Sequence, residues 1–120
     1  MNVNGKLLCV SRLLKVMPWL FLVIPIFYIS TCSIISYSRT RSFDAVEVGE
    51  GRNSVIVKLG APSKIEMPDH LFVRYAATQC KTPCVKRLWY ENRLAFDSEA
   101  WSVELDADDV VVHKAHWVSP

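Results

Sequence analysis

The amino-acid sequence predicts an α+β fold, in which two short N-terminal helices pack on a small antiparallel sheet of about three strands. Val55, Ile56 and Leu59 are spaced about one helical turn apart, which is typical of a helix with one apolar face. From Leu71 onward apolar and polar residues mostly alternate, which indicates strands. The acidic stretch "DADD" separates two such runs near the C-terminus and predicts a hairpin.

The chain begins with the layout of a secretory signal peptide. Lys6, Arg12 and Lys15 precede a long apolar run, and no acidic residue occurs before Asp44. The run ends at "ISTC", which resembles a bacterial lipobox, although Thr stands where Gly, Ala or Ser is usual. We therefore expect a signal peptide over residues 1–31, lipidation of Cys32, a lipidated tether over 32–41 and a domain over 42–120.

An uncleaved membrane helix is the alternative. The run from Val16 to Tyr37 carries no charge and is long enough to cross a bilayer, which takes about 20 residues. Both interpretations place the rest of the chain outside the cytoplasm, because the basic residues precede the run. Ser33 follows the cysteine where Asp would be the usual inner-membrane retention signal, so we expect a lipid anchor in the outer membrane, facing the periplasm. The alternative location is the inner membrane, with a single N-terminal helix.

The charge balance argues against a nucleic-acid partner. The chain carries 14 Lys and Arg residues against 12 Asp and Glu. Three of the basic residues precede Cys32, so the part from Cys32 onward has a net charge of −1 and lacks the basic surface that phosphate binding requires. No residues are spaced as a catalytic triad, so we expect a protein that is not an enzyme and has no cofactor and no small-molecule substrate.

The first half of the expected domain contains the two helices. "RSFDAVEVG" predicts a short amphipathic segment with Phe43, Val46 and Val48 as its apolar contacts. The second helix is expected to begin at the N-cap Gly51 and to end at Gly60, for which a left-handed conformation is predicted. Since Pro62 forbids continuation, the chain should then turn directly into the first strand.

A disulfide is predicted in "CKTPC". The runs "LFVRYAATQ" (71–79) and "VKRLWY" (85–90) both have strand character and flank the loop between Cys80 and Cys84. A three-residue loop between two strands brings its flanking residues within disulfide reach. In an oxidising periplasm the Cys80–Cys84 bond should form.

The C-terminal hairpin is predicted from strict alternation. In "WSVEL", Trp101, Val103 and Leu105 should face the core, and the residues between them should face outward. His113 and His116 are three apart in the returning strand, so they should point to opposite faces and cannot hold a metal together. For the stretch from Glu91 to Ala100, the sequence allows either a loop or a short helix.

This order of elements resembles the SmpA/OmlA family of small outer-membrane lipoproteins. The family pattern of Gly, a helix with Val, then Leu-Gly-x-Pro is matched by Gly49, Val55, Leu59, Gly60 and Pro62. The resemblance covers Phe43 to Trp117 and implies an envelope protein that binds another envelope protein, in outer-membrane assembly or integrity. The chain departs from the family at the helix cap and at the Asp108-Asp109 turn, so the resemblance bears more on the fold than on the role.

The predicted contact surface surrounds the disulfide loop. Four basic residues gather there in the sequence, namely Lys81, Lys86, Arg87 and Arg93. Charge reversal at Lys86 and Arg87 is expected to weaken partner capture and to leave the melting temperature nearly unchanged. The alternative function is a periplasmic immunity or inhibitor lipoprotein that binds a toxin or a hydrolase, since the predicted fold also resembles that of a β-lactamase inhibitor protein.

Overall fold

The computed structural model describes residues 3–75, 79–95 and 97–119. The chain forms two compact units, Met1–Ile34 and Ile35–Pro120. The first consists of most of helix α1 (Val3–Asp44), which contains Pro18 and Pro25 and also continues into the second unit. Within the segment Lys15–Asp44 of this helix, an 18-residue window has a mean hydropathy of 2.0. None of that window is buried in the protein. It is long and apolar enough to cross a membrane, and an N-terminal signal sequence has the same properties.

Helix α1 is longer than the sequence predicts. Two short helices were expected, but α1 has 42 residues and runs without a break through Cys32 and the predicted tether. Most of the predicted tether belongs to the folded unit, because the Ser36 hydroxyl donates to Glu99 Oε1 at 2.8 Å and Arg39 donates to the Leu59 carbonyl at 2.6 Å. The folded unit therefore begins at Ile35 instead of residue 42.

Helix α2 (Arg52–Leu59) begins and ends where the sequence predicts. Gly51 is its N-cap, with extended backbone angles, and Gly60 is its C-cap. The positive φ predicted for Gly60 is confirmed at 82°, but its ψ of −166° is outside the left-handed helical region. That combination of angles is essentially restricted to glycine.

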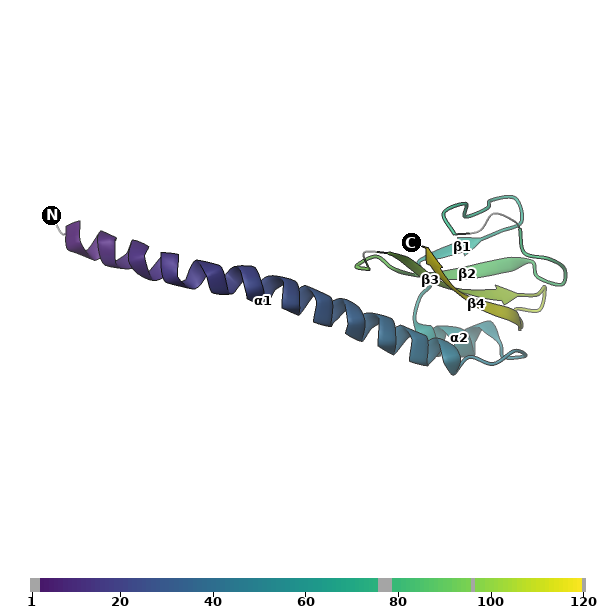
Figure 1. Cartoon of the computed structure of the whole chain (residues 1–120). Coiled ribbons are helices and arrows are strands. Elements are labelled where there is room, and N and C mark those ends of the chain that lie inside the picture. Colours follow the sequence, from purple (N-terminus) through teal and green to yellow (C-terminus); the bar gives the residue numbers. More distant parts are fainter. Residues whose placement is uncertain (1–2, 76–78, 96, 120) are drawn as a thin grey trace. The chain divides into compact units, whose positions relative to one another are not determined.

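Four antiparallel strands form one sheet, in the order β1 (Lys64–Glu66), β2 (Lys86–Asn92), β3 (Ser98–Leu105) and β4 (Val111–Ser119) (Figure 1). The α+β class is confirmed, with one strand more than expected. The predicted β3–β4 hairpin is also confirmed, and its turn contains Asp109 with a φ of 61°. In the described residues of the stretch from Glu91 to Ala100, which exclude Phe96, the ends of β2 and β3 are joined by turn and bend residues.

The predicted strand over 71–79 is wrong for the residues that the structure describes. Residues 71–75 and 79 are not in a strand, and 76–78 are outside the described part. The neighbour of β2 is instead the short strand β1, which follows α2 directly. The packing does not follow the alternation, because Leu71, Phe72 and Tyr75 pack against the sheet while Val73 is exposed.

The main core lies between the helices and one face of the sheet. Its members are buried apolar side chains from both helices, three strands and the turn that follows α1, namely Phe43, Val46, Val55, Leu59, Leu88, Tyr90, Trp101, Val103, Leu105 and Val111. The predicted burial of Leu59 and of the inward residues of "WSVEL" is confirmed. Val48 is 64% exposed, contrary to prediction, because α1 ends at Asp44 and Val48 lies in the turn that follows.

The second face of the sheet is partly covered as well. Trp89 and Ala100 are fully buried under Leu71, Phe72 and Tyr75. Trp89 lies 5.7 Å from the Phe72 ring and 5.4 Å from the Tyr75 ring. Ser102, which was predicted to face outward, is on this face and has no exposed surface.

Candidate functional site

The predicted disulfide is present. Cys80 and Cys84 are bonded, with their Cα atoms 5.6 Å apart. The Cys84 amide donates to the Lys81 carbonyl at 3.0 Å, which closes a tight turn. The bond closes a loop that precedes β2, and in the described residues no strand leads into that loop. We call residues 80–84 the disulfide loop.

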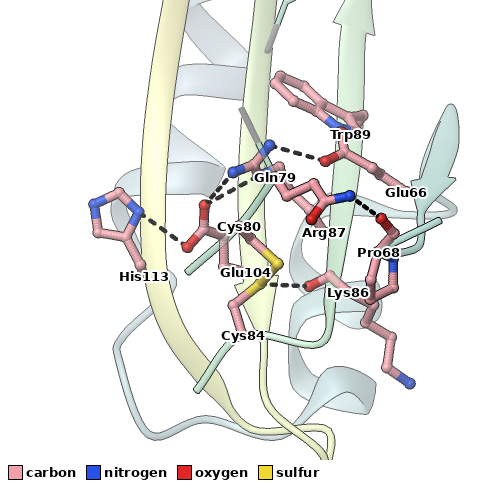
Figure 2. The surroundings of a disulfide bond; sticks show 10 residues. All are labelled: Glu66, Pro68, Gln79, Cys80, Cys84, Lys86, Arg87, Trp89, Glu104 and His113. Atoms are coloured by element: carbon pink, nitrogen blue, oxygen red, sulfur yellow. Dashed lines mark hydrogen bonds and ion pairs between the residues drawn. A yellow bond between two sulfur atoms is a disulfide. The ribbon is translucent and has the colours of Figure 1, made fainter. Parts of the chain in front are cut away.

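A buried ionic cluster lies beneath this loop. Arg87 is 5% exposed and lies between two carboxylates. It donates to Glu66 Oε1 at 3.0 Å and to Glu104 Oε1 at 2.7 and 3.0 Å (Figure 2). Glu66 also accepts hydrogen bonds from the Trp89 indole at 2.7 Å and from the Phe72 amide at 3.2 Å. The cluster thereby fixes both the sheet and the segment that covers its second face.

The register of three strands creates the cluster. Glu66 is the direct partner of Arg87, and Arg87 is the direct partner of Glu104, so all three side chains are on one face. Sequence reasoning missed this site and treated Arg87 as a surface residue. The signal was present as acidic residues in β1 and β3, but their pairing with Arg87 becomes visible only when the register is known.

The two histidines of β4 have different neighbours, as their spacing predicts. His113 Nδ1 lies 3.7 Å from Glu104 Oε2, on the second face (Figure 2). His116 Nε2 lies 3.1 Å from Glu99 Oε1, and its ring stacks on Trp101 at 5.1 Å, on the helix side. The prediction of opposite faces is confirmed.

An open hollow of about 400 Å³ lies between the disulfide loop and β4. Arg87 and Glu104 lie among its lining residues, beside loop residues and residues of the last strand. The described residues that line it are Gln79, Lys81, Thr82, Pro83, Arg87, Glu104, Val112, His113 and Trp117. The hollow thus combines charged groups at its rim with an aromatic and a proline surface, an arrangement suited to binding a side chain of a partner.

The four predicted contact residues do not form one patch. Lys81 is exposed at the hollow, whereas Arg87 is an interior residue. Lys86 forms an ion pair with Asp109, which brings the acidic hairpin turn to the same end of the sheet as the disulfide loop. Arg93 is 75% exposed and faces Glu91 at 3.5 Å, beyond the other end of β2. Since β2 runs from Lys86 to Asn92, about 20 Å separates the two ends.

Among the residues that the structure describes, three groups outside the hollow have shifted pKa values. Burial raises the pKa of Tyr90 to about 12. Burial, followed by the hydrogen bond to Glu91, raises the pKa of Tyr75. The hydrogen bond from Lys58 lowers the pKa of the Glu50 carboxyl. Each shift follows from core packing or a local ion pair, so these groups report on folding.

The predicted lipidation residue, Cys32, lies within α1 with a free, partly buried thiol. Its modification stays a prediction. Searches against known protein families, curated proteins and solved structures find no match for this chain. The resemblance to the SmpA/OmlA family therefore also stays a prediction.

Proposed function

We propose that this chain is a non-enzymatic, membrane-anchored envelope protein that binds another envelope protein through the hollow and the disulfide loop. The observation that carries the proposal is the position of an open hollow of about 400 Å³ beside a covalently closed, exposed loop. A loop ordered before binding loses less conformational entropy on association. Binding residues also tend to lie on loops that a rigid scaffold holds in place.

The chemistry of the hollow supports protein binding. Trp117 is 37% exposed, and tryptophan is enriched among the residues that dominate binding energies. Lys81 adds a charge at the rim, where it contributes to specificity and association rate. The ionic cluster around Arg87 holds the floor rigid, because each of its charged groups has a partner within 3.0 Å.

The apolar helix supports a location at the membrane. We propose a lipid anchor on Cys32 in the outer membrane, with the folded unit in the periplasm, and an inner-membrane helix as the alternative. The Cys80–Cys84 bond fits either location, since disulfides persist in oxidising compartments. A role in outer-membrane assembly or integrity rests on the family resemblance alone.

Capture from envelope extract tests this function. The full chain is used as bait beside two charge-reversal variants, Lys81→Glu at the hollow and Arg93→Glu at the far end of β2. We expect Lys81→Glu to weaken capture and Arg93→Glu to leave it unchanged, with equal melting temperatures for all three proteins. Capture of a secreted toxin or hydrolase would assign the inhibitor function instead, and equal capture by both variants would place the contact surface elsewhere.

A further inference from the structure

The outer edge of β4, the side away from β3, is only partly paired. At its start, the Gly49 amide donates to the Val111 carbonyl and the Val111 amide donates to the Glu50 carbonyl, each at 2.8 Å. Beyond Val111, no backbone group of the described residues pairs with this edge. Residues 112–118 thus offer a row of peptide groups that continues a pairing already begun by Gly49 and Glu50.

The edge has few of the usual protections against strand addition, apart from the inward-pointing Lys114. Exposed edge strands commonly carry proline, a short length or an outward lysine. The segment 112–118 contains no proline, and β4 has nine residues. Its single lysine, Lys114, is bound to the carbonyls of Phe43 and Asp44 at 3.0 and 3.1 Å, so it is held on the helix side.

The hollow runs along this same strand. His113 and Trp117 both line it and are four residues apart, which in a strand places them on one face about 13 Å apart. A strand laid beside β4 would direct every second side chain over the hollow. The exposed basic side chain there is Lys81, which lies beside the imidazole of His113, whereas Glu104 is bound to Arg87. The complement to this rim is an acidic side chain.

We propose that β4 binds its partner by strand addition, in which an extended acidic segment of the partner pairs with residues 112–118 and places a carboxylate in the hollow. The inference rests on the proposed function and specifies how the same surface binds. A second copy of this chain does not fit, because the segment 111–119 contains no Asp or Glu and carries His113, Lys114 and His116. The occupant is therefore a segment of a different protein.

Random heptapeptides displayed on phage serve as the probe, selected against the full chain in detergent micelles. We expect the enriched peptides to contain Asp or Glu and to slow amide hydrogen exchange within residues 112–118. Lys81→Glu should weaken peptide binding about tenfold, since it turns an attraction into a repulsion at the rim. Arg93→Glu is the matched control and should change binding less than twofold.

Several outcomes would overturn the strand-addition proposal. These are no enriched peptide, enriched peptides without an acidic residue, protection outside 112–118, or equal effects of the two substitutions. A dimer in sedimentation equilibrium that protects the same amides would show a second copy as the occupant and would also overturn it. Capture of an envelope protein without protection of β4 would refute strand addition alone. Peptide binding without any captured envelope protein would refute the proposed function alone.

Discussion

Gly60 ends α2 with backbone angles that other residues rarely adopt. Its φ of 82° and ψ of −166° belong to a region essentially restricted to glycine, while a Cβ there would meet no atom within 4 Å. The cost of a side chain is therefore backbone strain and not a clash. We expect Gly60→Val to lower the free energy of unfolding by about 1–3 kcal/mol in chemical denaturation. Gly51→Ser is the control, because Gly51 has equal space and a φ of −77° and serine is a favourable N-cap, and an equal loss there would contradict the strain argument.

Leu59 joins α2 to the core. Its side chain is 5% exposed among residues from both helices and the sheet. Leu59→Ala should lower the free energy of unfolding by about 2–5 kcal/mol, through lost burial and a residual cavity. Val57→Ala on the same helix is the control, since Val57 is 86% exposed and a surface change of this kind costs within about 0.5 kcal/mol. Equal losses in the two variants would exclude the packing assigned to α2.

Tyr90 makes stability depend on pH in the alkaline range. Its pKa is raised to about 12 by burial, whereas in the unfolded chain it is about 10. The folded state holds this proton more tightly, so stability is at full value below about pH 10 and falls as pH rises through about 12. We expect Tyr90→Phe to flatten this fall, as measured by urea midpoints at pH 8 and pH 11.

The same substitution removes the hydrogen bond from the Tyr90 hydroxyl to the Gly60 carbonyl at 3.3 Å, which should cost about 1 kcal/mol at pH 8. Burial also raises the pKa of Tyr75, so a smaller alkaline slope should remain in Tyr90→Phe. An unchanged slope in that variant would assign the alkaline loss to other groups.

The strands of the sheet depend on the buried ionic cluster. Arg87→Met should lower the free energy of unfolding by about 3–5 kcal/mol, because it leaves Glu66 and Glu104 buried without their cation. This corrects the expectation that charge reversal at Arg87 leaves the melting temperature unchanged. Lys86→Met is the control, since Lys86 pairs with Asp109 at the surface and should cost no more than about 1 kcal/mol. A stable Arg87→Met protein would show that the cluster is dispensable for folding.

Features that rest on contacts between residues close in the sequence were predicted, whereas contacts between distant segments were not. The helix from Arg52 to Leu59 and the hairpin of β3 and β4 rest on local spacing and turn chemistry, and both were predicted. Glu66, Arg87 and Glu104 come together only through the register of three strands, so no local pattern shows them. The run from Leu71 to Tyr75 was misread as a strand because part of it alternates, whereas Leu71, Phe72 and Tyr75 cover the sheet face from a turn.

At the scale of the whole molecule, α1 continues into the folded unit without a long linker. The unit begins at Ile35, and Ser36 already donates a hydrogen bond to Glu99. If the chain is cut before Cys32, only Ser33 and Ile34 separate the lipidated residue from the folded unit. The segment is then too short to carry the domain far from the membrane, since an extended chain spans at most about 3.6 Å per residue.

Lipidation at Cys32 is the prediction that decides between the two anchors. The order of basic residues, apolar run and "ISTC" favours cleavage and acylation, whereas the unbroken course of α1 through Cys32 is the form an uncleaved span would have. We expect a fatty-acid analogue to label the wild type and not Cys32→Ala, and mass spectrometry to find Cys32 at the mature N-terminus. Cys9→Ala is the matched control, because Cys9 precedes the predicted cut and its loss should leave labelling unchanged. A mature protein that keeps Met1 and takes no label would assign α1 as a membrane helix and place the folded unit at the inner membrane.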